Sequence, residues 1–232
     1  MLLALDTSTR LAGIALYDGV RGLIAEQNWH SANRHTVELT PRVAQMLAQA
    51  DATAADLCAV AVALGPGSFT GLRVALAVAK GLALANALTL LGVPTLDVVA
   101  YPHSRQPLPV IAVVPAGRGR VCWAPYALGP AGWSPQAPYG LTTVTALAES
   151  IDQPTLFAGE LAAADWATLA ERLGERLAER AYLLPPALSM RRAGYLAEIA
   201  WGRFAAGQAD DLATLTPIYL HEPAAPAGGG LA

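Results

Sequence analysis

Two short segments of this 232-residue sequence carry the residue types that bind phosphate. The first is Asp6-Thr7-Ser8-Thr9-Arg10, which follows an apolar run at residues 2–5. A turn with a carboxylate and hydroxyls can hold magnesium, and its backbone N–H groups can bind a phosphate. Alternatively, Asp6, Thr7 and Ser8 close a turn through side-chain hydrogen bonds. Spacing alone favours this second, structural interpretation.

The second segment is Gly65-Pro66-Gly67-Ser68-Phe69-Thr70-Gly71. It lies between an apolar run and a long helical pattern, so backbone donors and a helix dipole could face an anion there. It matches neither the Walker loop nor the dinucleotide fingerprint. A tight strand-to-helix turn explains it equally well, with Gly65 and Gly67 allowing close backbone packing and Ser68 capping the helix.

Other kinds of chemistry find little support in the sequence. None of the four histidines has the spacing of a metal site, and no Gly-x-Ser-x-Gly motif is present. Cys58 and Cys122 are far apart in sequence, which is typical of buried free thiols in a reducing compartment. The net charge is −3 without a basic stripe, so we do not expect tight, direct binding of nucleic acid.

The elements that must position these segments can be predicted from hydrophobic periodicity. In the first hundred residues we expect strands at 2–5, 12–17, 23–29 and 57–64, and helices at 34–50 and 69–90. Further on we expect a hairpin at 110–114 and 121–126, an irregular loop at 129–140, helices at 144–151, 162–180 and 188–206, and strands at 155–158 and 217–220. This alternation predicts an α/β protein with mixed strand directions.

Residues 74–93 are almost wholly apolar, so they need a test as a membrane span. They include Lys80, Gly81, Asn86 and Gly92, and a charge at mid-membrane depth is costly. We therefore expect a buried core helix and its connection. The first residues lack the basic region of a signal peptide, and an acid stands at position six. These features predict a cytoplasmic protein with no membrane contact.

Several motifs together resemble a known family. Residues 3–9 resemble the first phosphate loop of the actin, sugar-kinase and heat-shock-ATPase superfamily. The block at residues 65–73, continuing to 79–83, is more specific and resembles the signature of the TsaB (YeaZ) family. Shorter matches are found in residues 34–41, 92–97 and 217–220.

The resemblance implies an α/β, ribonuclease H-like fold with two lobes, of which the second is reduced. The implied division is an N-terminal actin-like ATPase lobe at 1–100, a divergent second lobe at 101–186, a C-terminal helix and strand packing back at 187–222, and a flexible tail at 223–232.

The resemblance also implies a non-catalytic scaffold subunit. Its partner would be a TsaD-type threonylcarbamoyl transferase that modifies tRNA at the adenosine next to the anticodon. A TsaE-type ATPase would complete the set, and tRNA would be contacted indirectly through the complex. The chain alone would form a homodimer. No cofactor is implied, and ATP would bind only weakly or at a partner interface.

Departures from catalytic relatives favour this interpretation. Residues 94–100 contain no histidine where TsaD-type sequences carry metal ligands, and residues 113–118 lack the acid of the superfamily's second phosphate loop. TsaB relatives often keep an acid near Pro115 and another near Arg120, and this chain has neither. The adenosine-binding glycine pair is reduced to Ala158-Gly159-Glu160.

We therefore predict no catalytic residue and no metal ligand. The predicted vestigial phosphate loops are Asp6, Thr7, Ser8, Gly65, Gly67 and Ser68. The alternative is an active ATP-dependent phosphotransferase or carbamoyl transferase of the same superfamily, using Asp6 and the loop at Gly65. In the family the helices that match residues 34–50 and 69–87 form a helical-bundle interface, and the candidate partner-binding residues here are Leu39, Val43, Met46, Leu72 and Leu76.

Overall fold

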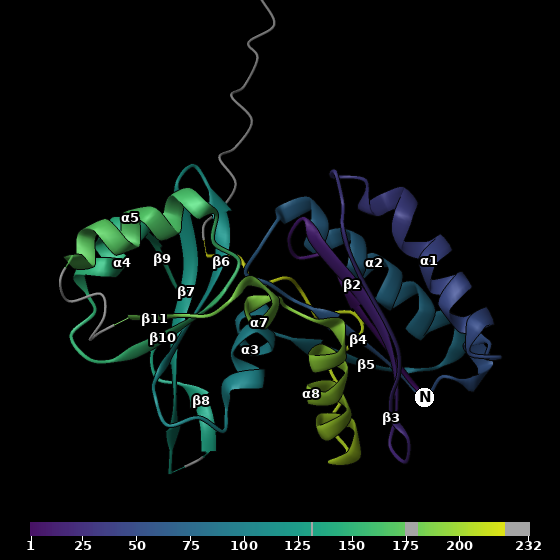
Figure 1. Cartoon of the computed structure of the whole chain (residues 1–232). Coiled ribbons are helices and arrows are strands. Elements are labelled where there is room, and N and C mark those ends of the chain that lie inside the picture. The colour runs from purple at the N-terminus through teal and green to yellow at the C-terminus, as the bar shows by residue number, and fades with distance from the viewer. Residues whose placement is uncertain (131, 175–180, 221–232) are drawn as a thin grey trace, which may run out of the picture.

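The computed structural model describes residues 1–130, 132–174 and 181–220, and the tail predicted at 223–232 lies outside them. Two β-sheets form two lobes side by side (Figure 1). The first sheet contains β1 (Leu2–Asp6), β2 (Leu11–Asp18), β3 (Gly22–His30), β4 (Ala59–Ala63) and β5 (Thr89–Val93) in the order β3-β2-β1-β4-β5. β1, β4 and β5 are parallel, whereas β2 is antiparallel to β1 and β3. The strands predicted at 2–5, 12–17 and 23–29 are thereby confirmed.

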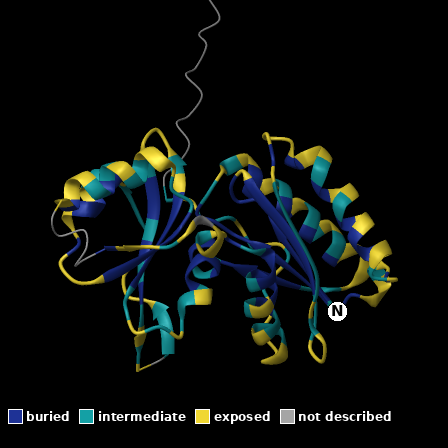
Figure 2. Cartoon of the chain, in the orientation of Figure 1, coloured by how far each residue is buried: buried dark blue, intermediate teal, exposed yellow. Residues whose placement is uncertain are grey.

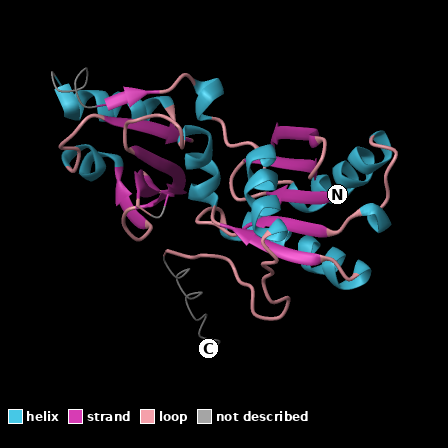
Figure 3. Cartoon of the chain, turned by 90° about the horizontal axis from the view of Figure 1, so that it is seen from below, coloured by secondary structure: helices cyan, strands magenta, loops and turns pink. Residues whose placement is uncertain are grey.

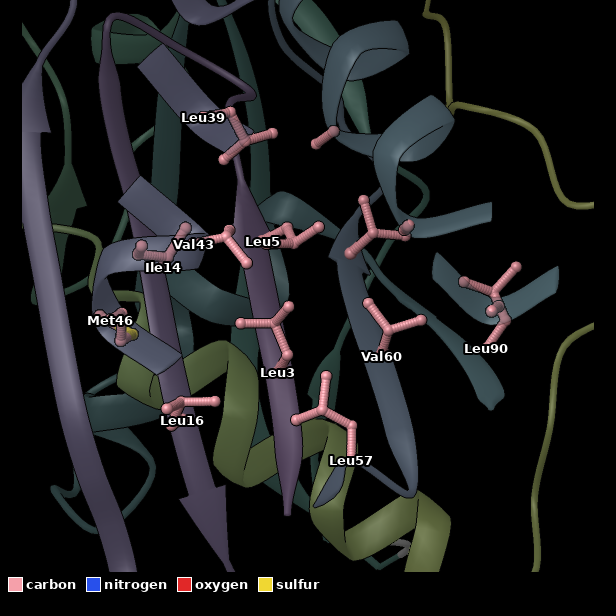
Figure 4. Packing of buried hydrophobic residues seen from close by; sticks show 14 of the residues in the cluster. Leu3, Leu5, Ile14, Leu16, Leu39, Val43, Met46, Leu57, Val60 and Leu90 are labelled. Carbon is pink, nitrogen blue, oxygen red and sulfur yellow. The ribbon is translucent and has the colours of Figure 1, made fainter. Parts of the chain in front are cut away.

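Helices cover both faces of the first sheet (Figure 3). α1 (His35–Gln49) and α2 (Phe69–Asn86) lie on one face and α8 (Ala193–Ala205) on the other. Side chains alternate along a strand, so Leu3 and Leu5 of β1 pack with the α1 and α2 core, including Leu39 (Figure 4). Each fully buried Leu contributes roughly 1.5–3 kcal/mol.

The opposite face of the first sheet combines leucines with several alanines. Ala4 of β1 packs in one cluster with Ala197 and Ala200 of α8. Small residues on both sides let the helix approach the strands closely. The segment just before α8 is thereby held next to the first sheet.

The second sheet contains β6 (Val110–Gly117), β7 (Arg120–Gly129), β8 (Gly132–Pro135), β10 (Thr155–Gly159) and β11 (Ala181–Leu183) in the order β11-β10-β6-β7-β8. β9 (Gly140–Thr143) pairs with β7. β6 is parallel to β10 and antiparallel to β7. This order repeats that of the first sheet, because the first strand is central, its hairpin partner lies on one side and two later parallel strands lie on the other. The molecule thus has the two-lobed actin-like fold.

Helices α4 (Val144–Glu149) and α5 (Ala163–Leu173) cover one face of the second sheet, and α3 (Thr95–Ala100) covers the other. Short turns of helix at η1 (Ala54–Asp56), η2 (Tyr101–His103) and α7 (Pro186–Ser189) join these elements. α3 precedes the expected boundary at residue 100, yet Leu96 and Val99 pack into the core of the second sheet. The two lobes therefore share this segment.

Four secondary-structure predictions are wrong. The helix predicted to Leu90 ends at Asn86, and Ala87 in the left-handed region leads into β5. The loop predicted at 129–140 contains β8. The single helix predicted at 188–206 is divided into α7 and α8 by the extended segment at 190–192, and Leu188 is 60% exposed.

The fourth is the C-terminal strand predicted at 217–220, which does not form. Ile218 donates one backbone hydrogen bond to the Leu64 carbonyl at 2.7 Å. Pro217 has no N–H to extend a ladder. The helix predicted at 162–180 forms as α5 up to Leu173, and residues 175–180 lie outside the described part of the chain.

Candidate functional site

The first predicted phosphate loop is a tight turn at the end of β1. The Oδ1 atom of Asp6 accepts hydrogen bonds from the Ser8 backbone N at 2.8 Å and from its Oγ at 2.6 Å. The Thr7 Oγ1 donates to the Gly71 carbonyl at 2.6 Å. These side chains close a turn in the manner of the structural interpretation.

The second predicted loop packs directly on the first. The Ser68 backbone N donates to the Ser8 carbonyl at 2.6 Å, and the Ser68 Oγ caps α2 by accepting from the Gly71 N at 3.3 Å. A methyl group at Gly67 would lie 2.2 Å from the Ser8 carbonyl oxygen, and one at Gly71 would lie 2.0 Å from the Thr7 oxygen. Glycine is needed at these two positions because backbone meets backbone. The N–H groups of Ser8 and Ser68 are thus used within the chain.

A buried arginine lies between the lobes. The Arg191 side chain is 1% exposed, and its Nε donates to Asp6 Oδ2 at 2.5 Å. Its Nη1 donates to Oε1 of Glu160, which follows β10 in the second lobe. Its Nη2 donates to the Thr9 Oγ1 at 3.1 Å and to the Leu11 carbonyl at 2.7 Å. One guanidinium therefore joins the first lobe to the second.

Local backbone geometry sets up this arrangement. Asp6 is the last residue of β1, and Arg191 lies on the extended segment between α7 and α8. Glu160 follows Gly159, whose φ is +120° and whose added methyl group would lie 2.0 Å from the Val113 carbonyl oxygen. The Thr9 Oγ1 also donates to Glu160 Oε2 at 2.6 Å. These contacts join the two lobes. We name them the cleft floor, because Thr9 and Glu160 line the cleft between the lobes.

Two carboxylates and one guanidinium meet at the cleft floor, so both carboxylates are paired but one net negative charge remains. Burial opposes the charge of Arg191, but the carboxylates of Asp6 and Glu160 outweigh that cost and raise the pKa of its guanidinium. Two carboxylates, a hydroxyl and a carbonyl are the oxygen ligands that a hard divalent cation prefers. Here they surround a guanidinium, so they do not fit a metal ion while Arg191 is in place. Among the described residues, no group of three or more His, Cys, Asp or Glu side chains could hold a metal.

Comparisons with known proteins identify the family. A model of the family described as "TsaD: tRNA N6-adenosine threonylcarbamoyltransferase" matches residues 29–226. The Escherichia coli tRNA threonylcarbamoyladenosine biosynthesis protein TsaB is 30% identical over 227 residues, which cover 94% of each chain. The chain belongs to the TsaB (YeaZ) family.

Two further relatives of the TsaB family agree with this assignment. The Bacillus subtilis TsaB is 38% identical over 101 residues, which cover 43% of each chain. The solved structure of YeaZ from Pseudomonas aeruginosa has a TM-score of 0.77 and 28% identity, and the match covers 94% of this chain and 99% of that one. The two-lobed fold is therefore that of TsaB-type structures.

The two loops that carry the predicted motifs lie together, since the segments of Asp6 and Ser68 contact each other. The partner-binding assignment must be corrected. Its five residues are between 0% and 8% exposed, namely Leu39, Val43, Met46, Leu72 and Leu76. All but Leu72 belong to the chain's own core between α1, α2 and the sheet, and Figure 4 shows Leu39, Val43 and Met46 there. Apolar residues at helical spacing usually form the face of a helix that packs on the protein's own core. Because these five residues are buried, they cannot contact a partner directly.

Sequence reasoning about the TsaB resemblance missed the central residues of the cleft. Arg191 and Arg192 are adjacent and alike in sequence, yet only Arg191 is enclosed. The sequence analysis named Glu160 only as part of the reduced adenosine-binding glycine pair. In the structure it supplies a carboxylate from the second lobe, where residues 113–118 contain none. Of the two cysteines expected to be buried, Cys122 is buried and Cys58 is half-buried.

Proposed function

We propose that this chain acts in threonylcarbamoyladenosine formation in tRNA as a non-catalytic scaffold subunit that binds a TsaD-type transferase. The observation that carries the proposal is the guanidinium of Arg191 between Asp6 and Glu160. Metal-assisted phosphoryl transfer needs a cation free to bridge carboxylates and phosphate oxygens. In this chain both carboxylates are paired with the guanidinium of Arg191, so they are not free to hold a metal ion that bridges them to a phosphate. The arrangement therefore weighs against the alternative of an active phosphotransferase.

The outward faces of α1 and α2 supply a surface for the partner. α1 exposes Val37, Pro41, Ala44 and Ala48 at helical spacing. α2 exposes Ala77, Gly81, Leu84 and Ala85 in the same way, and Leu84 is 74% exposed. Figure 2 shows exposed residues along the outward sides of these helices. We name these eight residues the outer helical face.

The composition of α2 fits a docking role better than a core role. Among the described residues, α2 is the one helix long and apolar enough to cross a membrane, with a mean hydropathy of 1.2, yet only 33% of it is buried. The expectation of a buried core helix is therefore wrong for its outer side. An apolar helix that is covered on one side only is typical of an interface.

Gly81 adds an independent argument for close approach by another helix. A methyl group added at Gly81 would meet nothing within 4 Å, so the chain's own packing does not require glycine there. Glycine inside a helix costs roughly 0.5–1 kcal/mol relative to alanine. A partner backbone lying against this position would account for it.

We extend the proposal to the other members of the complex. The same outer helical face would pair two copies of this chain when the transferase is absent. A TsaE-type ATPase and the tRNA would be engaged through the transferase, because the chain carries a net charge of −3 and no basic stripe.

The test is a binding titration with a purified TsaD-type transferase. Leu84→Glu should weaken binding by at least roughly a hundredfold, because it buries a charge in an apolar interface. Leu128→Glu is the matched control, since Leu128 is equally exposed at 74% but lies at the end of β7 in the second lobe. Equal binding by the wild-type chain and both variants would contradict the proposal.

A further inference from the structure

A large cleft opens between the lobes above the Arg191 contacts. Its volume is about 1230 Å³, and residues of both lobes line it. Ordinary small-molecule sites measure about 300–1,000 Å³. None of the eight residues of the outer helical face lines the cleft. Binding of a ligand in the cleft can therefore be tested independently of binding of the partner protein.

Part of the cleft lining favours negative charge. Arg10 lines the cleft, its side chain is exposed, and its guanidinium has no hydrogen bond or ion pair with any described residue. Ser68 and Phe69 at the N-terminus of α2 line it too, and this 18-residue helix directs the positive end of its dipole to the cleft.

A buried histidine also lines the cleft and lacks a complete set of hydrogen-bond partners. His35 lines the cleft, its side chain is 5% exposed, and its Nδ1 has no hydrogen-bond partner among the described residues. Burial lowers the pKa of His35 below 6.5, although the carboxylates of Glu38 and Asp6 oppose that effect. A neutral imidazole offers one donor and one acceptor to a ligand. Buried polar atoms normally have a partner, so this atom points to one that binds here.

The adjoining wall of the cleft is apolar and partly aromatic. The centroid of the Phe69 ring lies 5.1 Å from that of the Tyr219 ring, and Ile218, Leu220 and Met190 also line the cleft. The guanidinium of Arg73 lies 3.8 Å from the Phe69 ring centroid and donates to the Tyr219 hydroxyl, which fixes both rings. A preformed aromatic wall favours a flat, apolar ligand body.

We propose that the inter-lobe cleft binds a small aromatic monoanion without a metal ion. Its ring system would lie along the wall of Phe69 and Tyr219, and its anionic group would lie near Arg10 and His35. A magnesium-bound nucleoside triphosphate fits less well, because Asp6 and Glu160 are already held by Arg191. This proposal goes beyond the scaffold function and does not depend on it.

The test uses anilinonaphthalene sulfonate, a fluorescent aromatic monoanion, and uncharged phenylnaphthylamine as the matched neutral probe. The wild-type chain should bind one sulfonate dye saturably, and the neutral probe should bind roughly tenfold more weakly or worse. Arg10→Ala should weaken dye binding by roughly tenfold, the loss expected for one charge-assisted contact. Arg21→Ala, which changes an exposed arginine on the β2–β3 hairpin, should leave it unchanged.

Two further variants locate the dye. Ala163→Trp would fill the cleft from α5, whereas Ala164→Trp places the same side chain at an exposed neighbour that does not line it. Only the first should reduce binding, and Leu84→Glu on the outer helical face should not. Absence of dye binding, equal binding of both probes, or loss of binding in Leu84→Glu alone would overturn the proposal. Near-ultraviolet circular dichroism checks that every variant remains folded.

Discussion

The inter-lobe cleft floor and the outer helical face have opposite characters. At the floor, Asp6, Glu160 and Arg191 satisfy one another within the chain. On the outer face, apolar residues such as Leu84 have no covering element among the described residues. The carboxylates at the floor are thus paired within the chain, and the apolar surface is left on the outside. This contrast is what the proposed role of a non-catalytic binding subunit rests on.

Of the changes that test this comparison, removal of the Arg191 side chain should have the largest effect on stability. Arg191→Ala should lower the free energy of unfolding by about 3–5 kcal/mol, since it leaves two carboxylates buried without their partner. Urea denaturation monitored by circular dichroism measures the loss.

Arg192→Ala is the matched control for this change. Arg192 pairs with Glu26, but its side chain is 40% exposed, so the loss should be about 1 kcal/mol or less. Adding Glu160→Gln to Arg191→Ala should recover part of the lost stability, because one uncompensated charge is removed. Equal losses at Arg191 and Arg192 would contradict the central role of the buried guanidinium.

Two glycines of α2 test the same comparison, because Gly71 packs against the chain's own backbone and Gly81 lies on the outer helical face. Gly71→Ala should destabilise the chain by about 3 kcal/mol, because its methyl group would lie 2.0 Å from the Thr7 carbonyl oxygen. Gly81→Ala should stabilise the chain by about 0.5–1 kcal/mol, since open space surrounds that position. Thermal unfolding of both variants measures the two signs.

The Gly81 change should also separate stability from binding. If a partner helix approaches this position closely, Gly81→Ala should weaken binding of the TsaD-type transferase by roughly tenfold while it stabilises the free chain. A variant that is more stable and binds equally well would argue against close helix approach at this point.

The smallest effect concerns the pH dependence of stability at α8. Burial opposes ionisation of Glu26, but hydrogen bonds from Arg192 and from the Gly194 backbone N outweigh it and lower the pKa of Glu26 below 4.5. A lowered folded-state pKa means that the stabilisation is present above about pH 4.5 and is lost as the pH falls through the folded value. The free energy of unfolding of Glu26→Gln should therefore change less with pH in that range than that of the wild-type chain. The expected difference is about 1 kcal/mol, measured by urea denaturation at several pH values.

Much of the fold could be predicted because its signals are local. Residues 2–30 alternate clearly between strand and turn, and the three positive-φ residues at 117–119 form the predicted hairpin turn. The segment at 89–93 was misread because an apolar strand directly follows an apolar helix, and periodicity cannot separate two such runs.

The candidate site was predictable only in part, for a different reason. Close backbone packing at Gly67 was one of the two interpretations of the second loop, and the short approach of Gly67 to Ser8 agrees with it. The Arg191 contacts join residues 185 and 31 positions apart, to Asp6 and Glu160, and nothing local marks them. The five proposed interface residues failed because a helix with two apolar sides does not reveal from sequence which side meets its own sheet.

The most direct test compares the effect of magnesium on the wild-type chain and on Arg191→Ala, by thermal unfolding with Mg²⁺ and ATP or with EDTA. If the guanidinium stands in the cation's place, the unfolding temperature of the wild-type chain will be the same in both conditions, and magnesium will raise that of Arg191→Ala by binding the freed carboxylates. Stabilisation of the wild-type chain by magnesium and ATP would contradict the account.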